Sequence, residues 1–321
     1  MSSRERLRVS ELKAFYETEE CSIHAVDGID FALEPNQCIG IVGESGCGKS
    51  TLGAALMRAL SAPGRLVGGH IFLGEIDLSQ LSDKEFDQTT RWKRIAMIFQ
   101  GAMNTLDPVY NIESQLREIL KVHDFRGNYE AKIQESVLQV GLDSSVLKMF
   151  PHELSGGMKQ RVVIAMALLL EPDVLIADEP TTALDVLVQR DIMNLLRRMR
   201  AERGVSVILI THDLALVSEI ADKVGIMYAG QIVELGASKE IYTTPMHPYT
   251  QALIATIPRI RSKGKTINFI PGNPPNLCDP SDGCRFKPRC PKAMEVCGKN
   301  PAKTPTASGY VYCWLHDSKN S

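Results

Sequence analysis

The sequence has no apolar stretch long enough to cross a membrane and no secretory signal. Residues 1–6 lead into no apolar run, which excludes a signal peptide. The longest apolar stretch, Val162 to Leu170, is far shorter than the ~20 residues of a membrane-spanning helix and fits a buried helix. We therefore expect a soluble, cytoplasmic protein that contacts a membrane only through a partner.

The sequence also lacks an excess of one charge. Its formal net charge is −2 over 321 residues, which gives no global electrostatic case for binding nucleic acid or an anionic membrane. The one dense basic stretch, residues 197–203, is interpreted as the solvated face of a helix. Internal repeats and low-complexity tracts are absent. The remaining composition, 44% apolar, is that of an ordinary globular protein with one large domain and a smaller addition, or two modest domains.

Short apolar runs alternate with helical patterns along the chain. Alternating strands and helices predict an α/β fold whose sheet is mainly parallel. Lys223 to Leu235 is expected to form a hairpin that turns at Ala229-Gly230. The expected strands are Leu7–Ser10, Ile29–Leu33, Cys38–Val42, Ile95–Phe99, Val174–Ala177 and Val205–Ile210, and the expected helices are Thr51–Leu60, Ile112–Val122, Tyr129–Val140 and one that includes Val188–Met199.

A glycine-rich run joins the expected strand at 38–42 to the helix at 51–60. It reads Gly43-Glu44-Ser45-Gly46-Cys47-Gly48-Lys49-Ser50, followed by Thr51, which is a P-loop in the context that the motif requires. The glycines leave room for the backbone to wrap around phosphates, and the N–H groups of the helix N-terminus supply positive potential. Lys49 is expected to reach the β- and γ-phosphates, and Ser50 to ligate Mg²⁺. A chance glycine turn is the alternative.

Two acidic residues, Asp178 and Glu179, follow the apolar run at 174–177. The first carboxylate can hold a metal ion, and the second can polarise an attacking water. The alternative is a strand-end turn with solvated charges, which is an equally good interpretation of the pair alone. The P-loop in the same chain favours catalysis.

Gln100 and His212 also follow expected strands, whose ends in such sheets face the ligand crevice. Gln100 can contact Mg²⁺ or the water and sense the γ-phosphate, and His212 can orient water or contact the γ-phosphate. Taken alone, a strand-end glutamine is more often a surface residue and a single histidine more often structural.

A second anion-binding helix end is expected at Leu154-Ser155-Gly156-Gly157-Met158-Lys159-Gln160. Ser155 can cap the following helix, and the two glycines expose backbone N–H groups beside it. Because one nucleotide needs only one P-loop, this second site suggests the nucleotide of a second subunit. The alternative is an ordinary cap with a flexible turn.

Together these residues resemble the nucleotide-binding subunits of ABC transporters over roughly residues 5 to 240. The matching motifs are Walker A (43–50), the Q-loop (Gln100), the signature (Leu154–Gln160), Walker B (Val174–Asp178), the catalytic Glu179, the D-loop (Ala183-Leu184-Asp185) and the switch His212. The resemblance implies a P-loop NTPase (RecA-like) fold with an antiparallel β subdomain and a helical subdomain at about 101–165. Tyr16 falls where the family places an aromatic ring on adenine, although a packed strand-edge tyrosine explains it equally well.

The resemblance also implies the mechanism. Two such domains close head-to-tail on two ATP molecules, each between the P-loop of one domain and the signature of the other. Gln100, Ser50 and Asp178 would hold Mg²⁺, and Ser155, Gly157, Gln160 and Asp185 would complete a partner's site. The region near 105–150 would meet membrane subunits.

The last part of the chain is rich in cysteine and proline. Cys278, Cys284, Cys290, Cys297 and Cys313 all lie there, and in a reducing compartment such a cluster indicates metal before disulfides. Their spacings match neither a zinc C-x-x-C pair nor the bacterial ferredoxin run. The residues alone therefore leave iron–sulfur, zinc, and free thiols or disulfides open.

Three stretches, Met246–Leu253, Ile270–Pro275 and Gly283–Pro291, resemble the C-terminal extension of oligopeptide and dipeptide importer ATPases, which nickel and some oligosaccharide importers share. This resemblance implies a nucleotide-binding domain at 1–236 and a C-terminal domain at 237–321. It also implies a [4Fe–4S] cluster on Cys284, Cys290, Cys297 and Cys313, with Cys278 as a spare or a replacement for one of them.

The sequence thus predicts the ATP-hydrolysing subunit of a peptide importer at the cytoplasmic face of the membrane. Its expected partners are a paralogous ATP-binding subunit, two permease subunits and an extracytoplasmic binding protein, but no nucleic acid. The alternatives are the same motor in a nickel or oligosaccharide importer, a soluble ABC ATPase of DNA repair or translation, and a redox sensor whose ATPase has lapsed. Soluble ABC ATPases usually carry coiled-coil insertions or two cassettes, which this chain lacks, and the intact Glu179 and His212 disfavour a lapsed enzyme.

Overall fold

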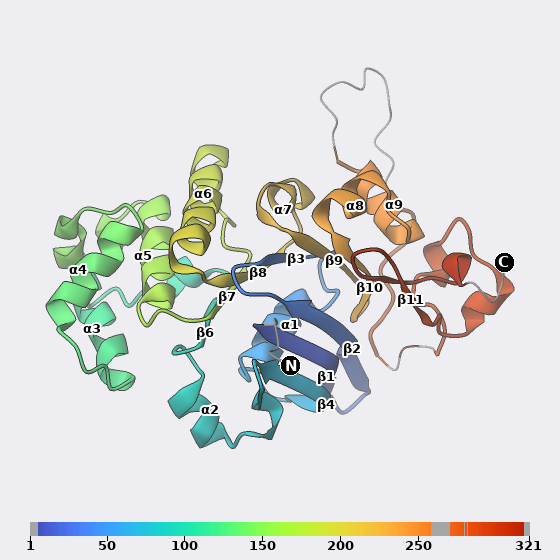
Figure 1. Cartoon of the computed structure of the whole chain (residues 1–321), viewed down its shortest axis with the longest axis horizontal. Coiled ribbons are helices and arrows are strands. Elements are labelled where there is room, and N and C mark those ends of the chain that lie inside the picture. The colour runs from blue at the N-terminus through green and yellow to red at the C-terminus, as the bar shows by residue number, and fades with distance from the viewer. Residues whose placement is uncertain (1–5, 258–269, 279, 281, 318–321) are drawn as a thin grey trace. The chain divides into compact units, whose positions relative to one another are not determined.

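The computed structural model describes residues 6–257, 270–278, 280 and 282–317 (Figure 1). The described chain divides into two compact units. The first contains residues 6–7, 33–37 and 73–209, and the second contains 8–32, 38–72 and the described residues from 210 onward. The second unit therefore combines the P-loop with the C-terminal extension, although these segments are far apart in the sequence.

The first unit contains three neighbouring strands, and predicted motifs lie at the ends of two of them. Its strands follow the order β8-β7-β6, with β6 at Ile95–Ile98, β7 at Val174–Asp178 and β8 at Ser206–Thr211, whose last two residues count with the second unit. Strands β6 and β7 are parallel, with Ile95 opposite Val174. All residues of the three strands are buried, as expected for continuous apolar runs in a sheet covered on both faces. The predicted strands are confirmed to within about one residue.

Helices make up most of the rest of the first unit. Helix α3 (Ile112–Val122) begins after Asn111, whose side chain accepts a hydrogen bond from Ser114 N at 2.9 Å, and α4 (Tyr129–Gln139) begins after Asn128 in the same way. Helix α3 buries Ile112, Leu116 and Leu120, which lie on one face at intervals of four residues. The elements are β5 (Ile76–Asp77), α2 (Asp83–Thr89), α3 (Ile112–Val122), α4 (Tyr129–Gln139), α5 (Gly156–Leu168) and α6 (Val186–Arg203).

The second unit has a small sheet in the order β2-β1-β4. Its strands are β1 (Leu7–Glu17), β2 (Ser22–Leu33) and β4 (Gly64–Leu73), each without one end residue that belongs to the first unit. Both β1 and β2 are longer than the sequence predicted, because polar residues alternate with buried ones and interrupt the apolar runs. The glycine-containing β4 was not predicted at all.

The larger sheet of the second unit has the order β11-β12-β10-β9-β3. Strand β3 (Cys38–Val42) runs parallel to β9 (Lys223–Tyr228), and β9 forms the predicted hairpin with β10 (Gln231–Ala237). Strand β12 (Tyr310–Tyr312) pairs antiparallel with β10, and β11 (Lys303–Pro305) pairs with β12. The C-terminal extension thus adds strands to the sheet that leads into the P-loop.

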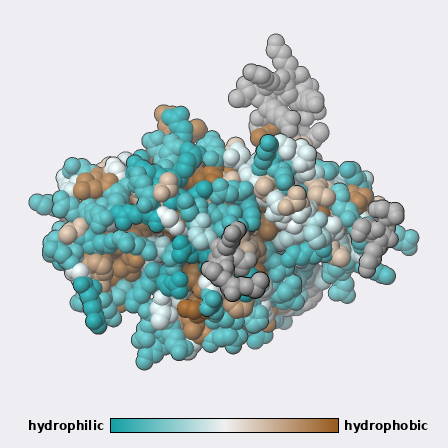
Figure 2. Space-filling model, in the orientation of Figure 1, coloured by the Kyte–Doolittle hydropathy of each residue, from teal (hydrophilic) through white to brown (hydrophobic). Residues whose placement is uncertain are grey.

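Short helices complete the second unit. They are α1 (Lys49–Leu56), α7 (Leu214–Ile220), α8 (Ser238–Thr243) and α9 (Pro248–Ala255). Helix α1 begins two residues earlier than predicted and ends four residues earlier. Among the described residues, no helix combines the length and apolar character needed to cross a bilayer. The face shown in Figure 2 is mostly hydrophilic, with hydrophobic residues in small separate patches.

Candidate functional site

The P-loop (Gly43–Ser50) lies tightly against two strands of the second unit. A Cβ atom at Gly43 would lie 2.1 Å from the carbonyl oxygen of Met227 in β9, and one at Gly48 would lie 1.8 Å from that of Ala25 in β2. Gly48 also has φ +102°, which favours glycine. No side chain caps α1 after Gly48, so the N-terminal N–H groups of this helix remain available for an anion.

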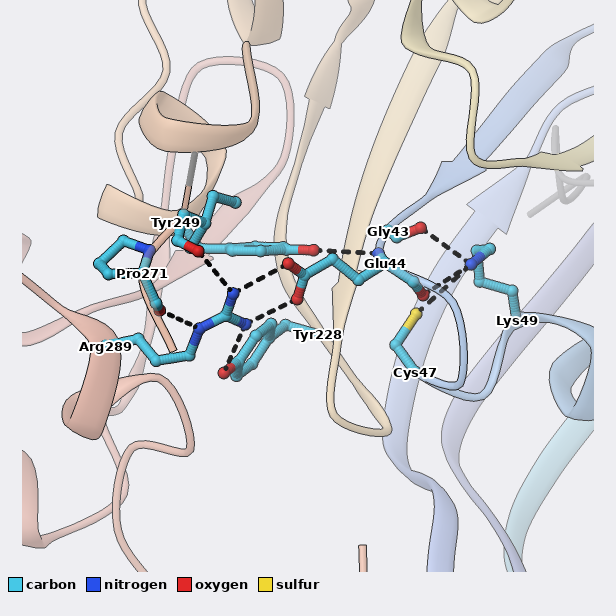
Figure 3. Close-up of polar contacts among 9 residues, drawn as sticks. Gly43, Glu44, Cys47, Lys49, Tyr228, Tyr249, Pro271 and Arg289 are labelled. Atoms are coloured by element: carbon cyan, nitrogen blue, oxygen red, sulfur yellow. Dashed lines mark hydrogen bonds and ion pairs between the residues drawn. The ribbon is translucent and has the colours of Figure 1, made fainter. Parts of the chain in front are cut away.

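Lys49 lies inside the loop and is only 7% exposed. Its Nζ donates hydrogen bonds to the carbonyl oxygens of Gly43 and Glu44, both at 2.9 Å, and lies 3.7 Å from Cys47 Sγ (Figure 3). Ser50, by contrast, is exposed at the start of α1. A phosphate group would therefore compete with the loop's own carbonyl groups for the ammonium of Lys49.

Cys47 occupies a variable position of the P-loop and is buried. Burial raises the pKa of its thiol, and the neighbouring ammonium of Lys49 only partly opposes this effect. Cys47 is therefore a protonated thiol at neutral pH, and it adds an uncharged side chain to the interior of the loop.

Two further predicted residues lie in the second unit. Tyr16 on β1 is half-buried, and its ring lies beside Gly64, where a Cβ would come within 2.6 Å of Cε1. His212 directly follows β8 and is exposed. Asp213 then caps α7 by accepting a hydrogen bond from Ala215 N at 2.8 Å. The packing of Tyr16 is compatible with both interpretations of this residue.

In the first unit, Asp178 is the last residue of strand β7, and Glu179 directly follows it. Asp178 is 2% exposed. Glu179 has φ +50°, an unfavourable conformation for a residue with a side chain, of the kind that is held in place at functional sites. Its carboxylate accepts a hydrogen bond from Thr182 Oγ1 at 2.8 Å. Because β6 and β7 are parallel, Gln100 after β6 comes to the same edge of the sheet as this acidic pair.

The signature (Leu154–Gln160) and the D-loop (Ala183–Asp185) meet within the first unit. A Cβ atom at Gly156 would lie 3.5 Å from Leu184 Cδ2, and one at Gly157 would lie 2.9 Å from Val188 Cγ1. Gln160 is buried. The glycines of the signature therefore allow the start of α5 to approach the start of α6.

Both helix starts are capped by the residues that the sequence singled out. Ser155 accepts a hydrogen bond from Met158 N at 3.3 Å and caps α5, while Asp185 accepts one from Val188 N at 3.0 Å and caps α6. Ser155 and Gly156 are exposed. Val186 and Leu187, which directly follow Asp185, are 79% and 66% exposed. The start of α6 is therefore an apolar surface open to solvent in this chain.

The structure does not support the predicted metal cluster. Cys284, Cys290, Cys297 and Cys313 are free thiols of one unit, and Cys284 N donates to Cys297 O at 3.0 Å. Burial, and then the other three thiols, raises the pKa of Cys313 to about 11. Yet no group of three or more His, Cys, Asp or Glu residues in the described chain is arranged to hold a metal ion. The thiols are neighbours, but they do not form a coordination site.

Cys278 is neither a spare thiol nor a replacement ligand, which corrects the sequence interpretation. It forms a disulfide with Cys21, which precedes β2, with the Cα atoms 5.6 Å apart. The two segments also pair through their backbones, since His24 N donates to Leu277 O at 2.9 Å and Ile23 bridges to Cys278. This disulfide attaches the extension to the small sheet. Two cysteines 257 residues apart gave no sequence signal of this pairing.

Two family models match the two parts of the chain that the sequence distinguished. The family model described as "ABC transporter" matches residues 26–182, and "Oligopeptide/dipeptide transporter, C-terminal region" matches residues 233–297. A further model, an AAA domain, matches residues 148–218. The first match contains the P-loop, and the second contains four of the five C-terminal cysteines, Cys278, Cys284, Cys290 and Cys297.

Similar proteins extend over nearly the whole chain. The oligopeptide transport ATP-binding protein OppD of Escherichia coli is 44% identical over 92% of this chain and 88% of its own length. The dipeptide transport ATP-binding protein DppD of Bacillus subtilis is 42% identical over 98% of this chain and 95% of its own length.

Solved structures share the fold. The cbiO1 protein of Clostridium perfringens, part of the ABC transporter complex cbiONQ, is similar with a TM-score of 0.65 and 28% identity, over 75% of this chain and 92% of that one. The predicted P-loop ATPase fold is thereby confirmed, and ATP hydrolysis with Mg²⁺ is the activity of such a domain. The chain belongs to the ATP-binding proteins of the oligopeptide and dipeptide ABC transporters.

Proposed function

We propose that this chain is the motor subunit of an ABC importer for peptides. The observation that carries the proposal is the combination, in one chain, of a complete set of ATPase motifs with an extension of the oligopeptide/dipeptide type. Relatives that share both parts are named for oligopeptide and dipeptide transport. We place the boundary between the two parts at residue 236.

In this proposal the P-loop holds the phosphates of ATP. Lys49 exchanges its contacts with Gly43 O and Glu44 O for the β- and γ-phosphates, which a charge-assisted hydrogen bond favours. Tyr16 would stack on adenine. Backbone and side-chain contacts to the phosphates would come from Gly43, Ser45, Gly46, Cys47, Gly48, Lys49, Ser50 and Thr51.

Catalysis would depend on the residues at the strand ends. Ser50, Gln100 and Asp178 would hold Mg²⁺, which neutralises charge on the phosphates. Glu179 would act as the general base toward the attacking water, with its carboxylate already oriented by Thr182. His212 would contact the γ-phosphate or orient the water.

A second ATP-binding subunit would complete the site. Ser155, Gly157, Gln160 and Asp185 would face an ATP bound to the partner's P-loop, and the exposure of Val186 and Leu187 beside them supports an interface there. We infer that the partner is a paralogue.

The helical subdomain would contact the membrane subunits. Exposed large apolar residues gather in and around this region, with Val109 at 70% exposure, and they include Phe99, Val109, Tyr110, Val122, Leu138 and Phe150. Such side chains fit contact with two permease subunits, which would hold the chain at the cytoplasmic face of the membrane. A substrate-binding protein on the other side would deliver the peptide.

A [4Fe–4S] cluster on Cys284, Cys290, Cys297 and Cys313 is a separate part of the proposal. The four free thiols belong to one unit, and they would have to rearrange and lose protons to become ligands. Brown, iron-containing protein after anaerobic purification is expected. Colourless protein without iron or acid-labile sulfide would contradict the cluster without affecting the ATPase proposal.

Transport by a reconstituted complex tests the function. The chain is co-expressed with two candidate permease subunits and a candidate paralogous ATP-binding subunit, and the complex is placed in vesicles with a peptide-binding protein. Di- and oligopeptides should stimulate ATP hydrolysis and accumulate, whereas Lys49→Ala complexes should do neither. Stimulation by nickel or oligosaccharides instead would reassign the cargo, and stimulation by nucleic acid would overturn the transport proposal.

A further inference from the structure

Glu44 is the first variable residue of the P-loop, and the motif itself gives it no role. In the structure it is the point where the loop meets the C-terminal extension (Figure 3). All three of its polar groups, the backbone N–H, the backbone carbonyl and the carboxylate, have partners within the same unit.

The carboxylate of Glu44 is held by Arg289 of the extension. Nη1 of Arg289 donates to Oε2 at 2.7 Å, and Nη2 donates to Oε1 at 3.0 Å, so the guanidinium and the carboxylate form a bidentate pair. The Arg289 side chain is only 5% exposed. The hydrogen bonds to Glu44 are the main cause that raises the pKa of Arg289, which therefore stays charged.

The other donors of Arg289 are also satisfied. Nε donates to Pro271 O at 2.8 Å, and the remaining N–H groups face Tyr228 Oη and Ile270 O, both at 3.4 Å. A guanidinium has five N–H donors in a fixed plane, so these acceptors define its orientation. Arg289 is therefore a rigid connection between the extension and the carboxylate of Glu44.

The backbone of Glu44 is held from two further sides. Its N–H donates to Tyr249 Oη at 3.1 Å, and its carbonyl oxygen accepts the 2.9 Å hydrogen bond from Lys49. Tyr249 of α9 is fully buried and packs against Tyr228, with ring centroids 4.6 Å apart, and against Phe286. The extension thus contacts the residue whose carbonyl holds the phosphate-binding lysine.

A second arginine connects the extension to the other end of the loop. Arg285 donates to Ala229 O at 2.5 Å and to the carboxylate of Asp27. The adjacent Gly230 N donates to Cys47 O at 2.9 Å, and Asp27 N donates to Gly230 O at 2.8 Å. Two hydrogen-bonded paths therefore lead from one short segment of the extension to the P-loop.

We propose that Arg289 is a positioning residue for ATP binding, which acts through Glu44 to keep the P-loop in its phosphate-accepting shape. The C-terminal extension is then a working part of the nucleotide site. This inference rests on the proposed role of the P-loop. The competing explanation is that Arg289 only attaches the extension to the rest of the unit.

Nucleotide binding to Arg289→Gln separates the two explanations. We expect the Kd and the KM for ATP to rise about tenfold, or about 1.4 kcal/mol, with kcat changed less than about twofold, because Arg289 does not touch the reacting atoms. Lys299→Gln, at an exposed position of the same extension, should bind ATP like the parent. Glu44→Gln should reproduce the effect, and the double variant should be no weaker than either single variant.

Several outcomes would overturn the inference. If Arg289→Gln lowers the melting temperature but its folded fraction binds ATP with the parent's Kd, Arg289 only attaches the extension. If that variant does not fold, Glu44→Gln decides, and unchanged ATP affinity again rejects the role. Lys49→Ala tests the assumption that the P-loop binds ATP. If this variant binds ATP like the parent, the P-loop is not the nucleotide site.

Discussion

The P-loop and the signature are both glycine-rich helix starts suited to anions, yet this chain builds them differently. The P-loop lies against two strands, and its lysine and Glu44 are hydrogen-bonded within their own unit. The signature is exposed at Ser155 and Gly156, and it lies beside a helix start whose apolar residues face solvent. The P-loop is held in shape by contacts within its own unit, whereas the signature leaves polar backbone and apolar side chains exposed beside it.

This difference suggests a division of work. The contacts that shape the P-loop are already formed within the chain, and they occupy Lys49 with carbonyl groups of its own loop. In the proposed dimer, the interactions that allow hydrolysis would await a partner, whose signature would reach the nucleotide bound to this P-loop. Substitutions on the two sides should therefore affect binding and turnover separately.

Glu179→Gln should have the largest effect, on turnover alone. We expect kcat for ATP hydrolysis to fall about 10³-fold, which is typical for loss of a general base, while the Kd for ATP stays within about twofold. The amide keeps the size of the side chain and an acceptor for Thr182 Oγ1. Phosphate release and nucleotide titration measure the two effects. Hydrolysis near the parent rate would show that Glu179 is not the base.

Lys49→Ala should have the next largest effect, on binding. Loss of a buried ammonium that is proposed to contact two phosphates is expected to raise the Kd for ATP about 100-fold, since each charge-assisted hydrogen bond contributes about 1.5–3 kcal/mol. Binding of a fluorescent ATP analogue measures this change. The control is Lys84→Ala at an exposed position of α2, which should bind like the parent. Equal ATP affinities of the Lys49→Ala and Lys84→Ala variants would show that the P-loop does not bind ATP through Lys49.

Val186→Asp tests the exposed side of the comparison. In the Glu179→Gln background, ATP-dependent association with the partner ATPase is expected to weaken about tenfold or more, because an apolar contact worth about 1.5–3 kcal/mol is replaced by a charge. Sedimentation with and without ATP measures the association. Val122→Asp, at a residue 67% exposed in the helical region, should associate normally. Equal association of both variants would place the interface elsewhere.

His247→Asn should have the smallest effect, on acid stability of the extension. His247 caps α9 by accepting from Tyr249 N at 3.0 Å, and burial lowers its pKa from 6.5 to about 3. The unfolded chain binds a proton between these values and the folded chain does not, so stability is lost as pH falls through this window. From pH 7 to 5.5 the loss is about 1 kcal/mol.

Asparagine can cap the helix without titrating, so His247→Asn should remove this part of the acid sensitivity. Urea unfolding at the two pH values measures it, and His70→Asn at an exposed position of β4 serves as the control. The same pH dependence in parent and His247→Asn protein would show that another group is responsible.

Much of the fold could be predicted because the relevant signals are local. The buried runs at Cys38–Val42 and Val174–Ala177, and the turn at Ala229-Gly230, each depend on neighbouring residues. Strand β4 was not predicted because its glycines weaken the apolar pattern. The lengths of β1 and β2 were underestimated because polar residues alternate with buried ones along both strands. The role of Cys278 was the clearest error, since residue type and number cannot show which thiols come together.

The sequence by itself determined that this chain is a P-loop ATPase with an importer-type extension, because a phosphate-binding loop is defined by a short run of residues and the strand and helix beside it. Only the tertiary structure decided that Arg289 holds Glu44 across 245 residues, that Cys21 bonds Cys278, and that β12 extends the main sheet. These contacts depend on how distant segments pack, and no local pattern encodes that. The P-loop motif therefore identified the site, while the fold determined what keeps its shape.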